Sequence, residues 1–287
     1  MPRALATREL WQTPAMLHMS GVDGNQARAA LTTVAPRLAA LVRSISNPAA
    51  PALGEWNAGD VAMHLAHVWE TLPALARGEL TSPLREPGEL AGLTTSWVRE
   101  EPGRDLEAIA ARIEAAASDY LSAPVSDPGP RPWLFEGTAL PASAFACHIL
   151  NESLVHGYNI AHAQRRRWRI DPAHAAMAIT GFLLPALSVV DPRFPVDQRH
   201  AAGVRARFDV RVRRTGRFCL LLDDGALTVE PPAGRAVDWH VSAEPVTLFL
   251  LLWSRINPWR GVLTGGLMIW GRRPSLGMRL PQMLRNP

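Results

Sequence analysis

The chain has 287 residues, more than one small domain needs and enough for two, and 47% of them are hydrophobic. Its formal net charge is +4, and every basic residue is an arginine. The arginines are spread along the chain and accompany abundant alanine, proline and glycine. We therefore attribute them to a compositional bias rather than to a nucleic-acid partner.

The positions of the cysteines and the hydropathy of the chain indicate the cellular compartment. Cys147 and Cys219 lie in unrelated segments and form no CxxC pair, which fits a reducing environment. The N-terminus lacks the basic start and apolar run of a secretory signal. The longest apolar run, Val246–Trp253, is too short to span a membrane. We therefore expect a soluble, cytoplasmic protein with no membrane partner.

Five stretches in the first 190 residues have apolar residues at helical spacing. We expect helices over roughly 25–46, 57–75, 105–121, 141–164 and 172–189. Asn57 and Asp60 have capping-box spacing at the start of the second helix. The proline-rich residues 122–140 indicate a loop, and residues 1–20 read as a poorly specified tail. This pattern predicts a helical bundle over residues 20–190.

The pattern changes after residue 200. Hydrophobic residues alternate with mostly basic ones along 204–212, which indicates a half-buried strand with a basic outer face. Asp223–Gly225 separates two further strands and predicts a hairpin. Two more strands are expected near 237–241 and 266–270, and helices near 244–255 and 275–284. Residues 200–287 therefore read as a small α+β domain built on an antiparallel sheet.

Glu152 and His156 are four residues apart on the core-facing stripe of the predicted 141–164 helix. A buried carboxylate is costly unless a partner compensates its charge, and a divalent metal is a simple partner for a Glu–His pair. His64 on the second helix can face the same interior, whereas the helical period places His67 and His148 to one side. The spacing alone fits equally a hydrogen-bonded Glu–His pair without metal.

Two short segments resemble a known family. The segment Trp56–Ala66 (WNAGDVAMHLA) is similar to the W-(S/T)-V-x-D-(V/L)-x-x-H-L-A segment of mycothiol-dependent maleylpyruvate isomerase-like proteins, which belong to the DinB-like four-helix superfamily. The segment Asn151–Ala161 (NESLVHGYNIA) resembles that family's E-x-x-V-H-x-(W/Y)-(D/N)-x-A segment. The resemblance implies that His64, Glu152 and His156 bind a divalent metal, usually zinc.

The C-terminal part resembles the sterol-carrier-like domain that follows the bundle in many members. Leu250–Arg255 (LLLWSR) and Leu263–Leu267 (LTGGL) are similar to the family's L-L-x-G-R and V-x-G-D segments. Ser254 stands where glycine is common, and Gly266 where aspartate is common. The implied fold class is α plus α+β, with a DinB-like four-helix metal-binding bundle at 20–190 and a sterol-carrier-like antiparallel-sheet domain at 200–287.

The resemblance implies a mycothiol-dependent metalloenzyme. The thiolate would add to an electrophilic small molecule, as in the cis–trans isomerisation of maleylpyruvate, or would stay attached, as in an S-transferase. We see no protein nucleophile, because neither cysteine lies near a plausible base in the sequence. A binding protein that uses the sterol-carrier-like domain, with no catalysis, is the alternative from another class.

Arg255 is the candidate catalytic residue for holding an anionic substrate. Its place in the Leu250–Arg255 segment suggests this role, because a guanidinium matches a carboxylate in bidentate fashion. The alternative is that Arg255 merely caps the helix that precedes it. Nothing in the sequence specifies an oligomeric state.

Overall fold

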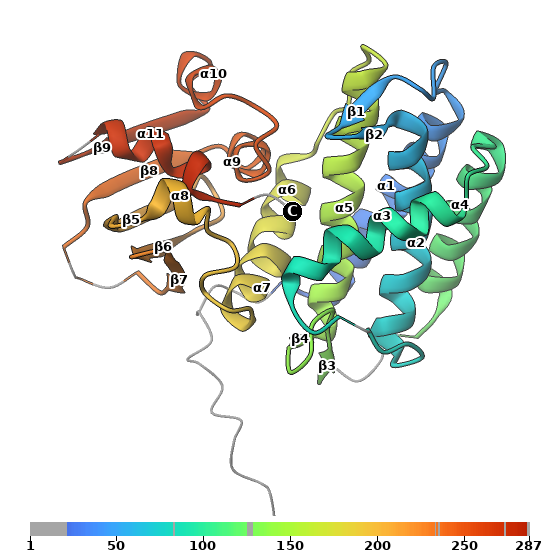
Figure 1. Ribbon diagram of the computed structural model, residues 1–287, viewed down its shortest axis with the longest axis horizontal. Helices are drawn as coiled ribbons and strands as arrows, with labels where there is room; N and C mark the ends of the chain where they lie inside the picture. Colours follow the sequence, from blue (N-terminus) through green and yellow to red (C-terminus); the bar gives the residue numbers. More distant parts are fainter. Residues whose placement is uncertain are drawn as a thin grey trace, which may run out of the picture.

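The computed structural model describes residues 22–82, 84–124, 129–232, 234, 236–272 and 274–285. The predicted tail at 1–20 lies outside the described residues. A helical N-terminal part and a smaller C-terminal part built on a sheet lie side by side (Figure 1). This arrangement confirms the predicted fold class.

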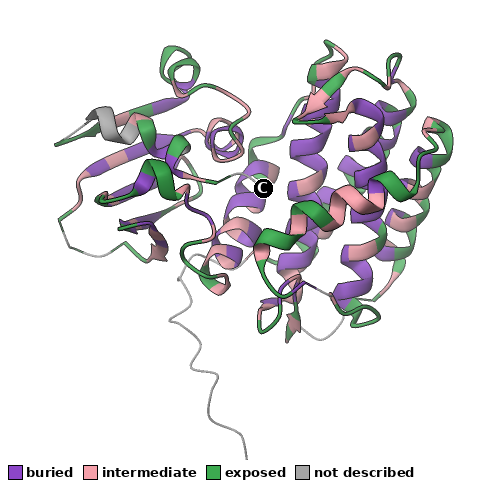
Figure 2. Cartoon of the chain, in the orientation of Figure 1, coloured by how far each residue is buried: buried purple, intermediate pink, exposed green. Residues whose placement is uncertain are grey.

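Four long helices form the N-terminal bundle. Its elements are α1 (Gly24–Arg43), β1 (Pro51–Leu53), β2 (Trp56–Asn57), α2 (Ala58–Arg77), the 3₁₀ turn η1 (Pro87–Glu89), α3 (Leu90–Glu100), α4 (Leu106–Ser122), β3 (Pro130–Pro132), β4 (Ala139–Pro141) and α5 (Ala142–Ala163). Helices α1 and α2 each pack against both α4 and α5, which closes the bundle. Figure 2 shows α2 and α5 as largely buried.

Local sequence explains where the helices begin and end. The Asn57 side chain accepts from the Asp60 amide and the Asp60 carboxylate accepts from the Asn57 amide, so the predicted capping box is confirmed. Helix α2 ends at Gly78, whose φ of 73° lies in the left-handed region that favours glycine.

Several elements of the bundle were not predicted, among them the β1–β2 hairpin. Residues 130–132 and 139–141 pair as a short antiparallel hairpin where a loop was expected. Helix α3 crosses α2 (Figure 1) and was not among the expected helices. Leu90, Leu93 and Trp97 have helical spacing, but only Val98 of α3 is fully buried, so this helix adds little to the core.

A broken helix connects the two parts of the chain. It comprises α6 (Pro172–Ala178), the π-helical turn η2 (Ile179–Leu183) and α7 (Leu184–Val189). A Cβ on Gly181 would lie 2.4 Å from Cys147 Sγ, so glycine permits the close approach of this turn to α5.

This connecting helix is also apolar enough to resemble a membrane span. The stretch Pro172–Val189 has a mean hydropathy of 1.4, and it is the one stretch of the described chain with the length and composition of a span. The sequence reading, which rested on Val246–Trp253, overlooked it. Core helices of soluble proteins often have the same length and composition. Here α6 packs against both α5 and the second domain.

The C-terminal part is a five-stranded sheet with short helices. Its elements are α8 (Gln198–Ala201), β5 (Arg205–Val212), β6 (Gly216–Asp223), β7 (Ala226–Glu230), β8 (Trp239–Ala243), α9 (Pro245–Leu252), α10 (Pro258–Leu263), β9 (Leu267–Gly271) and α11 (Pro274–Met283). The strand order is β7-β6-β5-β8-β9. The sheet is antiparallel as predicted except between β5 and β8, which run parallel.

Strand β5 has the predicted alternation with one exception. Phe208 and Val210 are buried on the inner face, and Arg211 is exposed on the outer face. Asp209 shares the outer face but is only 5% exposed, because Arg217 donates to it and His240 Nδ1 lies 2.7 Å from its Oδ2. The outer face is thus an ion-pair network rather than a uniformly basic surface.

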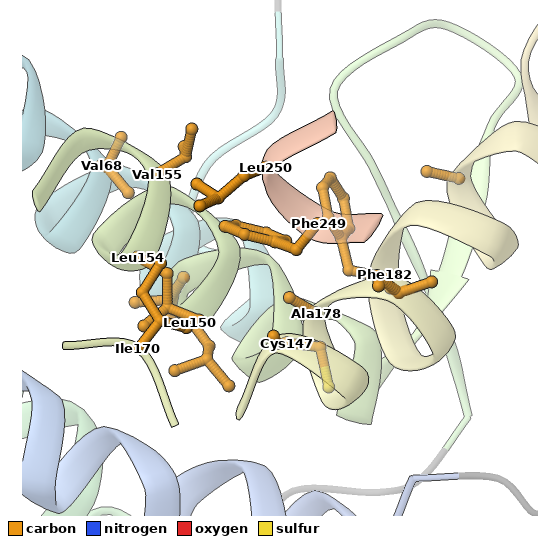
Figure 3. Close-up of a cluster of buried hydrophobic side chains, with 14 of the residues drawn as sticks. Val68, Cys147, Leu150, Leu154, Val155, Ile170, Ala178, Phe182, Phe249 and Leu250 are labelled. Atoms are coloured by element: carbon orange, nitrogen blue, oxygen red, sulfur yellow. The ribbon is translucent and has the colours of Figure 1, made fainter. Parts of the chain in front are cut away.

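The hydrophobic core runs across the junction of the two parts. Phe249 and Leu250 of α9 belong to the same buried cluster as Leu150 and Leu154 of α5 and Phe182 of η2 (Figure 3). This continuous packing holds the C-terminal part against the bundle. Because the core is continuous, the domain boundaries 20–190 and 200–287 remain a prediction of which residues fold as separate units.

Candidate metal centre

Helices α2 and α5 bring three metal-ligand side chains together. His156 Nε2 lies 3.1 Å from Glu152 Oε2, and His64 Nε2 lies 3.6 Å from the same oxygen. One ligand atom from each of the three residues lies within 4.8 Å of the other two. His156 is one turn beyond Glu152 on α5, and the packing of α2 against α5 places His64 opposite them.

Burial and hydrogen bonding favour the protonation states that a metal requires. Burial alone would raise the pKa of the Glu152 carboxyl, but hydrogen bonds from His148, His156 and His64 outweigh it and hold this pKa well below its usual range. Burial lowers the pKa of His64, although its hydrogen bond to Glu152 opposes the shift. The site therefore presents an ionised carboxylate and a neutral His64 imidazole at neutral pH.

The surrounding side chains fix the orientation of two imidazoles. The Asn159 amide lies 3.2 Å from His156 Nδ1, and His156 Nε2 faces Glu152. Unlike an indole N–H, this amide can turn its oxygen toward Nδ1 and accept a hydrogen bond there, which leaves Nε2 free for a metal. The ring of Trp56 lies 5.1 Å from the ring of His64. Such outer contacts hold ligand rings in place before a metal arrives. The donor set of two imidazoles and one carboxylate fits a divalent metal with an open position.

The expectation for His148 was wrong. The helical period placed it to one side, but His148 Nε2 lies 3.6 Å from Glu152 Oε1. Trp133 Nε1 donates to His148 Nδ1 at 3.4 Å, and the imidazole stacks on Phe182 with ring centroids 3.9 Å apart. A ring that accepts at Nδ1 carries its proton on Nε2, so His148 faces Glu152 as a donor rather than as a metal ligand.

His67 was also misplaced. It was expected at the edge of the bundle or in solvent, but it is only 8% exposed. Helix α3 covers it, with Glu101 Oε1 2.8 Å from His67 Nε2 and Trp97 edge-on to its ring. His67 Nδ1 has no hydrogen-bond partner among the described residues and lies at the wall of the cavity beside the metal centre.

A hydrogen-bond chain connects the second domain to Glu152. Trp253 Nε1 donates to Asn151 Oδ1 at 3.0 Å, and Asn151 Nδ2 donates to Glu152 Oε1 at 3.0 Å. Asn151 is fully buried, so few other arrangements are open to its amide. The sequence alone marks Trp253 as a core or pocket-wall residue, equally suited to packing and to ligand contact, and does not indicate this link to Glu152.

We expect Trp253→Phe to weaken metal binding about tenfold, the lower end of the effect of losing an outer partner of a metal ligand. The substitution keeps an aromatic ring but removes the N–H that orients Asn151. Competition with a chelator measures the metal affinity. The matched control is Trp259→Phe, at a tryptophan that is 63% exposed. Equal affinity in both variants would show that the chain from Trp253 has no influence on the site.

Arg255 lies at the wall of the same cavity. Its Nη1 donates to the Trp253 carbonyl at 2.6 Å, and its Nε is buried without a hydrogen-bond partner in the described structure. Burial lowers the pKa of Arg255, and the negative charge of Glu152 opposes that shift. Its role as a substrate clamp stays a prediction, but a guanidinium with an unused donor beside the ligands suits it.

The two departures from the family pattern have local consequences. Ser254 adopts a φ of 53°, the left-handed conformation in which glycine costs least. A Cβ on Gly266 would lie 2.4 Å from Thr247 Oγ1, so aspartate does not fit there unless Thr247 moves. The chain therefore keeps the backbone turn before Arg255 but fills the space beside Gly266 differently.

The cysteines offer no alternative chemistry. Burial raises the pKa of the Cys147 thiol to about 12, and Cys219 is also buried. A thiol with such a pKa is almost wholly protonated at neutral pH and is a poor nucleophile. This agrees with the expectation that the chain supplies no nucleophile of its own.

Comparisons with known proteins bear on the family and the fold. Residues 27–161 match the family model of the mycothiol maleylpyruvate isomerase N-terminal domain. No curated protein sequence is similar enough to count as a match. A crystal structure of a histidine-to-alanine mutant of mycothiol-dependent maleylpyruvate isomerase aligns with a TM-score of 0.51 at 11% identity, over 86% of this chain and 93% of its own. At that identity the likeness shows the fold alone.

The C-terminal part has its own structural match. The solution structure of sterol carrier protein domain 2 of Helicoverpa armigera covers 28% of this chain and 68% of its own length, at 19% identity and a TM-score of 0.25. That score is too low to support an argument by itself. The maleylpyruvate isomerase structure extends over both parts of the chain, so it supports the order of bundle and sheet domain.

Proposed function

We propose that this chain, whose residues 27–161 match the model of the mycothiol maleylpyruvate isomerase N-terminal domain, is a mycothiol-dependent metalloenzyme. We propose that His64, Glu152 and His156 hold one divalent metal, with zinc the first candidate. The observation that carries the proposal is the convergence of these three side chains on the wall of a large cavity, with Glu152 held in its ionised form.

A bound divalent metal with an open position lowers the pKa of a thiol ligand and so supplies the thiolate at neutral pH. The chain's own residues prepare the place for this chemistry. His148 and Asn151 hold the Glu152 carboxylate, and Asn159 holds His156. The apolar walls of the cavity exclude water from the reacting groups, which strengthens electrostatic interactions there.

The reaction proposed is addition of the thiol to an electrophilic double bond. The sulfur bonds to one alkene carbon and the thiol proton goes to the other, which leaves a single bond that can rotate. Elimination of the thiol then returns the isomerised alkene, as a maleylpyruvate isomerase requires. If the adduct is released instead, the same steps give an S-transferase. We assign Arg255 the role of orienting a carboxylate of the electrophile.

One observation favours a second function. The cavity is lined mainly by apolar side chains from both parts of the chain, as expected of a protein that binds an apolar ligand without catalysis. Such a protein would not need an ionised glutamate and three imidazoles at one end of its cavity. We therefore rank this binding function second. We propose a cytoplasmic location and no nucleic-acid partner for either function.

Metal analysis of the purified protein tests the proposal. We expect about one zinc per chain, and we expect mycothiol to stabilise the metal-loaded protein in a thermal-shift assay. At a ligand concentration about 100 times Kd the gain is about 2.7 kcal/mol. A protein that contains no divalent metal, takes up none on reconstitution and shows no shift with mycothiol would overturn the assignment.

A further inference from the structure

A cavity of about 690 Å³ extends from the metal centre into the second domain. One end is lined by the metal-ligand residues and Arg255. The other end reaches Phe218, Leu220 and Leu227 on the inner face of the sheet. Its volume is in the range that holds a drug-sized molecule, and thus exceeds what a small dicarboxylate fills.

Most of the cavity wall is hydrophobic core. Leu72 and Leu75 of α2, Leu184 of α7 and Leu220 of β6 are each at most 4% exposed. Helix α3 adds to this wall, because its half-buried residues Leu90, Leu93 and Trp97 line the cavity. An apolar wall of this extent gains free energy from an apolar occupant.

The charged groups on the wall are few. Among the lining residues that the structure describes, the arginines are Arg255 and Arg285. Arg285 is exposed and lies over the Phe194 ring, 5.6 Å from its centroid. Glu55 is at the rim, with a side chain that is 93% exposed. This leaves one half-buried guanidinium, that of Arg255, to receive an anionic group beside the ligands.

We propose that the electrophile is a monocarboxylate with an extended apolar tail, and that the tail lies along the cavity away from the metal centre. This inference rests on the proposed thiol chemistry. A second carboxylate buried among the leucines and phenylalanines of the far end would meet only Arg285 there among the described arginines, and Arg285 is exposed and lies over the Phe194 ring, so its burial would cost free energy. A hydrocarbon tail gains free energy from the same surface with each added methylene.

The chemistry needs a conjugated carbonyl beside the double bond. The thiol sulfur bonds to the β-carbon, the electron pair of the carbon–carbon π bond moves to the α-carbon, and that carbon takes the thiol proton. No oxidant or reductant is consumed. Compounds of the 4-oxo-2-alkenoate class carry the carboxylate, the conjugated ketone and a variable alkyl tail in one molecule, so they probe the proposal directly.

Two measurements test whether the cavity binds an apolar tail. With zinc-loaded protein and mycothiol, kcat/KM for 4-oxo-2-alkenoates is expected to rise about threefold to fourfold per added methylene from a methyl to an octyl tail. With metal-depleted full-length protein, calorimetry is expected to show dodecanoate binding more tightly than hexanoate by a similar factor per methylene. Neither saturated acid can react with a thiol, so the second measurement reports the cavity alone.

A polar substitution in the cavity wall tests where the apolar tail lies. Leu93→Gln places an amide against the tail and is expected to weaken dodecanoate binding about tenfold, with unchanged metal content. Leu93→Met keeps an apolar side chain of similar size and is expected to bind as the unmodified protein does. The matched control is Leu263→Gln, at a leucine that is 85% exposed and is not among the residues lining the cavity.

The outcomes separate this inference from the proposed function. An active, metal-loaded enzyme whose kcat/KM does not change with tail length would overturn the apolar tail and leave the thiol chemistry standing. A protein that holds no metal and has no thiol-dependent activity would overturn the enzyme, and a tail-dependent affinity would then describe a carrier. Equal loss of dodecanoate binding in Leu93→Gln and Leu263→Gln would place the tail elsewhere.

Discussion

Replacing Glu152 with alanine is expected to remove the bound metal and to lower kcat/KM by more than about 100-fold, because it deletes a ligand rather than an outer partner of one. Three imidazoles face this carboxylate, so its loss leaves the metal without its negative donor. The bundle should remain folded, since alanine suits a helix and the deleted carboxylate was costly to bury. Metal content by mass spectrometry and helicity by circular dichroism measure the two effects.

The matched control for this prediction is Glu55→Ala. Glu55 lines the rim of the same cavity, but its side chain is 93% exposed. We expect that variant to keep its metal and most of its activity. If Glu152→Ala retained a full complement of zinc, the three-residue site would be wrong and the Glu–His pair without metal would become the correct reading of these residues.

The sequence predicted the parts of the site that depend on helical periodicity. Glu152 and His156 are one turn apart, and the apolar stripe of α2 points His64 toward the interior, so their convergence follows from two helices packing along their apolar faces. The family resemblance selected the same three residues. The capping box at Asn57 was predictable for a similar reason, because it depends on residues three apart.

Contacts between distant segments could not be predicted in this way. His148 turns toward Glu152 because Trp133 and Phe182, from the hairpin region and the connecting helix, pack around its ring. His67 is buried because α3 folds over it. Helical angles describe one helix at a time, so an imidazole at the edge of a stripe can be recruited by a segment that the pattern does not contain.

In the second domain, too, contacts between distant segments could not be predicted from local sequence patterns. Its strands follow the alternation of hydrophobic residues closely, but the parallel pairing of β5 with β8 depends on how the chain crosses between them. The hydrogen bond from Trp253 to Asn151 joins residues from different domains. Nothing in either local pattern marks these two side chains as partners, so the sequence alone does not predict this hydrogen bond.

Acidification is expected to release the metal. Protons compete with the metal for the imidazole nitrogens, so affinity should fall about tenfold per pH unit for each ligand that titrates. Burial lowers the pKa of His64 below its ordinary value of 6.5, and the pKa of Glu152 is held well below 4.5. Proton competition at His64 and Glu152 should therefore begin only below the ordinary histidine value of 6.5, and affinity should fall as the pH drops further. Chelator competition across this range measures it.

The lowered pKa values of His64 and Glu152 also predict that acid destabilises the metal-depleted protein. Between the folded pKa of His64 and 6.5 the unfolded chain binds the proton and the folded chain does not, so stability falls as pH falls through this window. Glu152 acts in the same direction below 4.5, because its folded pKa lies under its unfolded one. Each group contributes at most about 1.4 kcal/mol per pH unit.

Thermal unfolding of metal-depleted protein at a series of pH values tests whether stability falls as pH falls. The His64→Gln variant is the comparison. The variant lacks the imidazole whose burial disfavours the charged form, so its melting temperature should fall less between about pH 6.5 and pH 5. A melting temperature that rises on acidification, or an equal fall in both proteins, would mean that His64 is not held neutral by burial. The ligand set would then lose the poised protonation state on which the proposed thiol chemistry depends.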